Sequence, residues 1–343
     1  MHDDYLWDRS GDPDPEVVRL ERVLAGIRHR SAPPPFVITD AVHPRSRWTA
    51  SWQFSARMAA IAALLIVAVG ALLFGLRPRG AEWHVAVLGG RPTVGRVALD
   101  TRGTLAVGQW LVTDASSRAE IQVGDIGSVE VAPNSRVRLI SARPGNNRIE
   151  LRKGLVRAMI FAPPREFAVE APSATAIDLG CVYTLEIGDD GTGLLHVQSG
   201  WVAFASGGRE SFVPSGASAQ TRPDFGPGTP YFDDADEGLR AALARVDFEP
   251  KTSPNRTAAL DAVLAAARPR DGITLWHLLS RVRPDERARV FDRLAQIAPP
   301  GDGVTRDGIL RGDREMLEAW WDQLGLQPLS WWRTWERPWP PGK

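Results

Sequence analysis

Cys181, the only cysteine among 343 residues, is the strongest candidate nucleophile in the chain. A thiol becomes nucleophilic where a neighbouring cation, base or helix N-terminus lowers its pKa. Cys181 lies in the apolar, strand-like run LGCVYTLEI, and His196, in the next predicted strand, could approach it across a hairpin. Buried cysteines commonly act as small apolar residues. The sequence therefore favours a structural Cys181 over a Cys-His pair, and we expect no catalytic residue.

Residue types that bind metals are present but scattered along the chain. No two histidines stand at ligand spacing, and no second cysteine could complete a zinc site. The sequence GDDG, from Gly188 to Gly191, lacks the further acidic ligands of a calcium loop and suits a hairpin turn. No phosphate-binding loop or nucleophile elbow occurs. We therefore expect neither a metal nor a cofactor. The histidines are His2, His29, His43, His84, His196 and His277.

The charges of the chain balance, with 41 Lys and Arg residues against 41 Asp and Glu residues. Nucleic-acid-binding domains usually carry a basic surface, so this balance favours no direct nucleic-acid partner. A single cysteine cannot form an internal disulfide, so the cysteine count does not indicate whether the protein resides in an oxidising or a reducing compartment. The organisation of the chain is more informative than its overall composition.

One long apolar run, Met58–Leu76, predicts a transmembrane helix over residues 57–76. The run contains no charged residue, and arginines flank it at both ends. About 20 apolar residues match a hydrocarbon core roughly 30 Å thick. Trp48, Trp52 and Phe54 precede the run, where an interfacial aromatic belt would lie. Arg45, Arg47 and Arg57 before the run, against Arg77 and Arg79 after it, favour a cytoplasmic N-terminus.

The segment before this run predicts a short cytoplasmic arm. Within residues 1–30 a helix is expected to begin at Pro15, and a proline-rich linker fills residues 31–56. A helix this short needs a partner surface, because it cannot be stable alone. Docking of an amphipathic helix into a groove is a common solution. The predicted partner-binding residues are Trp7, Leu20, Leu24 and Ile27.

Regions of different sequence pattern follow the apolar run. Residues 82–221 contain short Val-, Ile- and Leu-rich runs separated by Gly, Asn, Asp and Pro, which predict an all-β domain, either a sandwich or a β-roll. Residues 233–326 carry apolar residues at helical spacing and predict an α-helical domain. Residues 327–343 form a Trp- and Pro-rich tail. The expected fold is therefore a mixed, multi-domain chain with one transmembrane helix.

The β-rich region resembles the FecR domain, the extracytoplasmic part of FecR-type transmembrane regulators. The segments IQVGDIGSV, APNSRV, IELRKGLV, DLGCVYTLEI and VQSGWV are similar to the motifs of that family and follow in the same order within residues 94–221. Where the family commonly has R-G-T-x-F, this chain has L-G-C-V-Y, so Cys181 occupies the threonine position. The residues that carry the resemblance are Asn134, Gly154, Gly180, Cys181, Tyr183 and Gly200.

This resemblance implies a single-pass regulator of the bacterial inner membrane, with its C-terminal domains in the periplasm or otherwise outside the cytoplasm. Its expected partners are proteins: a sigma factor in the cytoplasm and an envelope protein outside. The C-terminal helices differ from the βαβ module of iron-transport regulators, and the N-terminal arm lacks the His…Cys-x-x-Cys pattern of a zinc-binding anti-sigma domain. The alternative is an envelope binding or scaffold protein that holds a polysaccharide or protein ligand and transmits no signal.

Overall fold

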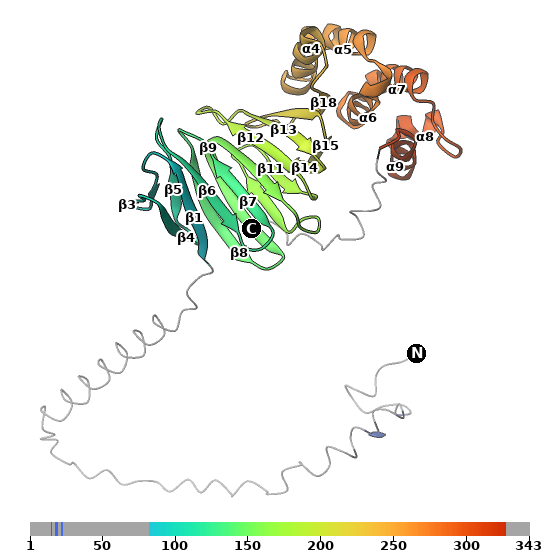
Figure 1. Cartoon of the computed structure of the whole chain (residues 1–343). Helices are drawn as coiled ribbons and strands as arrows, with labels where there is room; N and C mark the ends of the chain where they lie inside the picture. Colours follow the sequence, from blue (N-terminus) through green and yellow to red (C-terminus); the bar gives the residue numbers. More distant parts are fainter. Residues whose placement is uncertain (1–14, 16–17, 20–21, 23–81, 327–343) are drawn as a thin grey trace, which may run out of the picture. The chain divides into compact units, whose positions relative to one another are not determined.

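The computed structural model describes residues 82–326, together with residues 15, 18, 19 and 22. Residues 82–326 all belong to one unit of the chain, Leu73–Lys343. This unit contains a β domain followed by a helical region (Figure 1). No helix within the described residues is long and apolar enough to cross a membrane. The predicted span, residues 57–76, and the tail, residues 327–343, lie outside the described residues.

The strands of the β domain form two sheets that share one strand, β9 (Asn146–Ile160). The first sheet, sheet A, pairs the second half of β9 with β7 and β12, and the second sheet, sheet B, pairs its first half with β8 and β10. In order, sheet A holds β4 (Arg102–Ala106), β1 (Glu82–Gly89), β6 (Arg118–Val123), β7 (Gly127–Val131), β9, β12 (Val182–Ile187), β13 (Gly193–Ser199) and β16 (Ala217–Arg222), with β17 (Gly226–Pro227) and β18 (Tyr231–Phe232) beyond.

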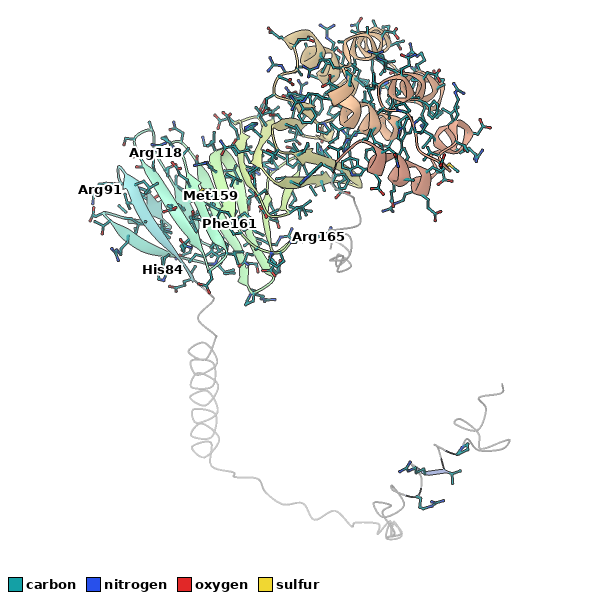
Figure 2. All side chains as sticks on the ribbon, turned by 45° about the vertical axis from the view of Figure 1, so that its right-hand side comes forward. His84, Arg91, Arg118, Met159, Phe161 and Arg165 are labelled. Carbon is teal, nitrogen blue, oxygen red and sulfur yellow. The ribbon has the colours of Figure 1, made fainter. Side chains whose placement is uncertain are left out.

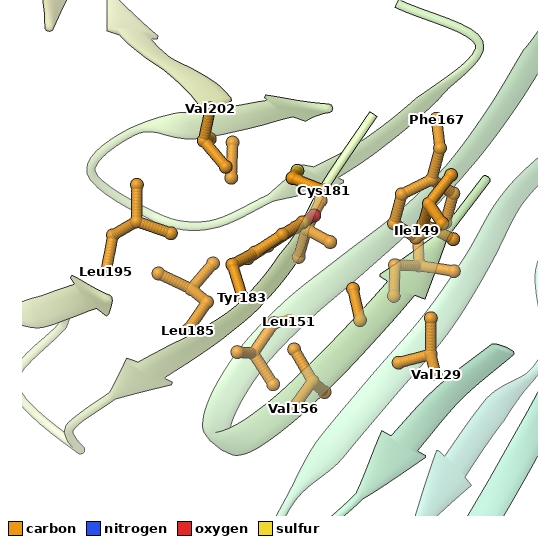
Figure 3. Packing of buried hydrophobic residues seen from close by; sticks show 14 of the residues in the cluster. Val129, Ile149, Leu151, Val156, Phe167, Cys181, Tyr183, Leu185, Leu195 and Val202 are labelled. Carbon is orange, nitrogen blue, oxygen red and sulfur yellow. The ribbon is translucent and has the colours of Figure 1, made fainter. Parts of the chain in front are cut away.

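Sheet B is antiparallel except for the parallel pair of β9 and β10. It holds β3 (Val97–Ala98), β2 (Thr93–Val94), β5 (Trp110–Val112), β8 (Arg136–Arg143), β9, β10 (Phe167–Glu170), β11 (Thr175–Asp178), β14 (Trp201–Ser206) and β15 (Arg209–Pro214). Alternate residues of both sheets enter one continuous apolar core, for example Ile121 and Val129 from sheet A with Leu139 and Phe167 from sheet B. The β domain is therefore a sandwich, one of the two predicted forms (Figure 3).

The helical region begins after Phe232 and follows the predicted apolar stripes. Its elements are α4 (Glu237–Phe248), α5 (Pro254–Ala266), a 3-10 turn (Pro269–Asp271), α6 (Gly272–Arg281), α7 (Pro284–Ile297), α8 (Arg306–Arg311) and α9 (Arg314–Gln323). Asp236, Thr305 and Asp313 cap the N-termini of α4, α8 and α9 with their side chains, as short polar residues commonly do. Leu260, Leu278 and Leu294 are fully buried in a second core.

The two cores meet where α6 and α9 pack on the β domain. Trp321 of α9 and Ile273 of α6 belong to the core of the β domain, whereas the adjacent Trp320 belongs to that of the helices. The Trp321 ring lies 5.9 Å from the ring of Trp201 in β14 and 4.8 Å from that of Trp276 in α6. Aromatic contacts therefore join the helical region to sheet B.

Candidate functional site

Two segments that resemble FecR motifs touch where β9 passes from sheet B to sheet A. Asn134 has a left-handed backbone with φ 56°, which turns the chain into β8. The next residue, Ser135, accepts a hydrogen bond at its hydroxyl from the Leu155 N–H, at 2.9 Å. The Ser135 N–H donates to the Thr113 hydroxyl at 2.9 Å. The turn after β7 is thus tied to β9 at the residue following Gly154.

Gly154 lies at the corner of β9 because a side chain would not fit there. Its φ is +92°, and a Cβ would lie 2.2 Å from the Ser135 Oγ and 2.4 Å from the Ser135 Cα. Ser135 Cα is backbone and cannot move aside as a side chain can. Glycine therefore allows β9 to change sheets.

Gly180 and Gly200 form a second close approach at the end of the sandwich. Gly180 has φ +88°, and Gly200 has φ +77°. A Cβ on Gly200 would lie 2.2 Å from the Gly180 carbonyl oxygen and 3.0 Å from the Cys181 Cα. The chain entering β12 and the chain entering β14 therefore pass each other with backbone in contact.

Cys181 is 3% exposed and belongs to the core of the β domain. Its thiol donates to the Asp178 Oδ2 at 2.7 Å, and the Gly180 N–H donates to the Asp178 Oδ1, also at 2.7 Å. Burial, followed by the negative charge of Asp178, raises the pKa of the Cys181 thiol far above its ordinary value. This environment disfavours the thiolate that a nucleophile requires.

Asp178 is the residue of this site that the sequence did not single out. Its carboxyl is 1% exposed, and burial raises its pKa from 3.8 to about 7. The only sequence signal is its position two residues before Gly180, which allows an aspartate side chain to accept from the backbone N–H of a turn. That signal predicts a turn and gives no indication that the carboxyl is buried against Cys181.

Tyr183 points into the same core. Its side chain is fully buried among apolar residues such as Leu185 and Val202, with its hydroxyl on the side of Cys181 (Figure 3). The hydroxyl has no hydrogen-bond partner in the described part of the chain. Burial, followed by the charge of Asp178, raises the pKa of Tyr183 well above 10. The six motif residues therefore have structural roles as turns, close approaches or core positions.

His196 does not pair with Cys181. In the register of β12 and β13 it lies opposite Thr184, on the outer face of sheet A, whereas Cys181 and Tyr183 face the core. The His196 Nδ1 lies 3.2 Å from both the Ser218 Oγ and the Asp233 Oδ1. Ser218 donates to Asp233 at 2.8 Å. A serine–histidine–aspartate triad needs serine and aspartate on different ring nitrogens, so this cluster has the wrong geometry.

The junction of the β domain and the helical region contains a buried polar network that the sequence did not predict. The His277 Nε2 of α6 accepts from the Phe212 N–H of β15 at 3.0 Å, and its Nδ1 donates to the Ile273 carbonyl at 2.8 Å. Arg281, one turn further along α6, donates to the Glu210 carbonyl at 2.7 Å and the Ser211 hydroxyl at 2.7 Å. The two side chains therefore bind outward-facing backbone groups of β15.

This network covers the edge of sheet B. An edge strand exposes backbone groups that can pair with another chain, and proteins commonly cover it. Asp247 of α4 completes the network by accepting from the Thr229 N–H at 2.6 Å and by pairing with Arg209 of β15. Burial, followed by the positive charge of Arg281, lowers the pKa of His277 well below 6.5, so the imidazole is neutral in the native protein.

The predicted partner-binding residues and the expected lack of a metal site remain to be compared with the structure. Trp7, Leu20, Leu24 and Ile27 lie outside the described residues. No group of three or more histidine, cysteine, aspartate or glutamate side chains that could hold a metal ion occurs within the described part of the chain.

Comparisons with known proteins give partial matches. No curated protein matches the chain. Two crystal structures of a proposed anti-sigma factor from Parabacteroides distasonis ATCC 8503, at 1.65 and 2.50 Å resolution, are similar in part. In each case the identity is 13% and the TM-score 0.32, over 40% of this chain and 64% of that one. The chain thus spans less than two thirds of the structures that it matches.

The family comparison covers the middle of the β domain, from the start of β5 to β14. This segment includes the corner at Gly154, the approach of Gly180 and Gly200, and the buried pair of Asp178 and Cys181. Residues 109–203 match the family model described as FecR protein, and this chain therefore carries a FecR domain in that segment.

Proposed function

We propose that the chain is a membrane-anchored FecR-like regulator that controls a sigma factor across the bacterial inner membrane. The observation that carries this proposal is the FecR match at residues 109–203, placed after the uncharged run Met58–Leu76. A short arm precedes the run, and the β domain and the helical region follow it. This order suits a protein with a cytoplasmic output and an extracytoplasmic sensor.

The proposed output is the N-terminal arm, residues 1–30. Leu20 and Leu24 are four residues apart in the sequence, the spacing of one helical turn, and are proposed as the central anchors, with Trp7 entering a separate pocket. The arm carries many carboxylates, which anionic lipid headgroups repel. This charge supports a protein partner over lateral packing on the membrane.

The proposed sensor is the β domain with its helical region. His277 accepts a hydrogen bond from β15 and Arg281 donates one to it, so a partner bound to either part acts on the same folded unit. The proposal assigns no catalytic step to this unit. The support is the buried, hydrogen-bonded thiol of Cys181 and the geometry of the His196 cluster.

Retrieval of the sigma factor by the arm tests the output. A peptide of residues 1–30 should retain a sigma factor from a lysate of the source cells, and the double variant Leu20→Asp/Leu24→Asp should not. Val18→Asp is the matched control, since position 18 lies off the stripe of Leu20 and Leu24 and this change should preserve binding. If the double variant retrieves the same proteins as the wild type, the docking proposal is wrong.

Reporter fusions test the topology. A reporter fused after Arg30 should report the cytoplasm, and one fused after Asp233 should report the opposite compartment. If both reporters indicate the same compartment, the proposed membrane span is wrong. Opposite compartments without retrieval of any sigma factor would favour the alternative of an anchored envelope scaffold.

A further inference from the structure

The start of β1 is the part of the β domain that follows the proposed membrane span most closely along the chain. β1 begins at Glu82, so five residues, 77–81, separate it from the proposed membrane span. Five fully extended residues reach at most about 18 Å. If the span crosses the bilayer as proposed above, the start of β1 therefore lies close to the membrane surface.

The register of sheet A identifies the loops at the same end. Val85 lies opposite Ile121, which places the β6–β7 turn, residues 124–126, beside Glu82. Gly127 lies opposite Ile160, so the loop that follows β9 adjoins that turn. In Figure 2, His84 and Phe161 lie on the side where the chain enters β1, whereas Arg91 and Arg118 lie toward the opposite end.

The loop after β9 exposes a large apolar side chain at this end. Phe161 is 78% exposed, the most of the large apolar residues in the described part of the chain. Its N–H donates to the Ile126 carbonyl at 2.7 Å, which fixes the backbone while the ring points away from the core. Pro163 in the same loop is exposed, and Val107, in the β4–β5 turn at this end, is 45% exposed.

Charged side chains at this end are of both signs. Arg143 and Arg165 carry positive charge, and Glu82, Asp125 and Glu166 carry negative charge. Two positive charges against three negative ones give no net attraction to anionic lipid. Apolar side chains such as Phe, in contrast, bind at the boundary between headgroups and acyl chains through the apolar area that they bury.

We propose that this end of the β domain rests on the outer surface of the membrane, with Phe161 inserted among the phospholipid headgroups. The inference rests on the proposed membrane anchoring, because the short connection holds the domain against the bilayer. It assigns to Phe161 an apolar contact with zwitterionic phospholipid that does not depend on anionic lipid.

Fluorescence quenching in the full-length protein tests the contact. The variant Phe161→Cys is labelled with a bimane fluorophore and reconstituted into nanodiscs of phosphatidylcholine that carry a nitroxide on the headgroup. The matched control is Leu88→Cys, because Leu88 is 52% exposed and lies at the other end of β1. The unmutated chain corrects for labelling of Cys181, and Pro163→Cys replaces Phe161→Cys if the latter lowers the melting temperature.

The label at position 161 should be quenched several-fold more than the label at position 88, and addition of phosphatidylglycerol should leave the ratio unchanged. Equal quenching would overturn the proposal. Pyrene labels at position 161 that give excimer emission without lipid quenching would assign the surface to a second copy and also overturn it.

A label at Ile66→Cys, read with nitroxides on the acyl chains, separates this inference from the anchoring. Quenching at position 66 without quenching at position 161 refutes the docked surface and leaves the anchor intact. Absence of quenching at position 66 would refute the membrane anchor, and the docked surface with it.

Discussion

Ser135 and Gly154 belong to different FecR motifs and meet at the corner of β9. The Ser135 hydroxyl binds the N–H of the residue after Gly154 at 2.9 Å, and a Cβ on Gly154 would lie 2.4 Å from the Ser135 Cα. The turn that begins β8 and the bend that moves β9 into sheet A are thus a single packed unit.

The variant Gly154→Ala should destabilise the protein strongly. Its φ of +92° strains any L-residue, and the new methyl group would overlap the backbone of Ser135. Together these terms should lower the free energy of unfolding by about 3 kcal/mol or more. Urea unfolding of the detergent-solubilised full chain would measure the change.

Gly145→Ala is the control for this change. Gly145 also has a positive φ, +73°, but among the described residues, its two chain neighbours apart, no atom lies within 4 Å of its ideal Cβ position. Only the backbone strain remains, so the loss should be about 1–2 kcal/mol. Ser135→Ala should not rescue Gly154→Ala, because the overlap with the Ser135 Cα persists. Equal losses for the two glycine variants would show that the close approach has no energetic consequence.

Substitutions of Cys181 should affect stability and leave signalling intact. In Cys181→Ser the hydroxyl can still donate to Asp178, whereas Cys181→Val removes the donor. The valine variant should therefore lose about 1–3 kcal/mol of unfolding free energy, and the serine variant less. Chemical denaturation ranks the two, and transcription from a sigma-dependent promoter reports the output. Loss of that output in Cys181→Ser at an unchanged melting temperature would contradict the structural role.

The elements predictable from the sequence are those fixed by local pattern. The GDDG turn indeed joins β12 and β13, with the Gly188 N–H donating to the Thr192 carbonyl at 2.8 Å. The helical stripes were predictable for the same reason, and Leu278 and Leu294 are buried as their spacing indicates. Period-two alternation likewise predicted strands, but it could not indicate that the halves of β9 belong to different sheets.

The parts of the site that could not be predicted depend on contacts between distant segments. His277 and Phe212 are brought together only when α6 packs on β15, and no local pattern records that contact. The sequence pattern placed Cys181 and His196 in neighbouring predicted strands, which suggested that they could meet. The register places His196 opposite Thr184, three residues beyond Cys181, and Cys181 belongs to the core, so the two side chains do not meet.

The carboxyl of Asp178 should make stability fall as the pH rises. Its pKa is about 7 in the folded protein, against 3.8 ordinarily, because burial disfavours the charged form. Between these values the folded state holds a proton that the unfolded state has released. This contribution is therefore present below pH 4 and is lost as the pH approaches 7, by roughly 4 kcal/mol at most.

Denaturation at a series of pH values checks the effect by comparing the wild type with Asp178→Asn. The difference between their unfolding free energies should change steadily between pH 4 and pH 7 and become constant above it. Asp125→Asn, which changes an exposed carboxyl in the β6–β7 turn, should follow the wild type. Parallel curves for the wild type and Asp178→Asn would mean that the carboxyl is not buried as described.

His277 should contribute a pH dependence of the opposite sign. Its pKa lies well below 6.5 in the folded protein, because burial and Arg281 disfavour the imidazolium. The unfolded state therefore takes up a proton near pH 6.5 while the folded state does not. Stability from this group is complete above pH 6.5 and decreases as the pH falls below it.

The variant His277→Gln separates this contribution from that of Asp178. A glutamine carbonyl can accept from the Phe212 N–H but takes up no proton, so the loss of stability between pH 6.5 and pH 5 should disappear. His277→Leu also removes the titration, but it deprives the Phe212 N–H of its acceptor and should cost about 1–3 kcal/mol at pH 7. Equal stability of the glutamine and leucine variants at pH 7 would contradict the bond from β15 to α6. A glutamine variant that keeps the acid sensitivity of the wild type would assign that sensitivity to another group.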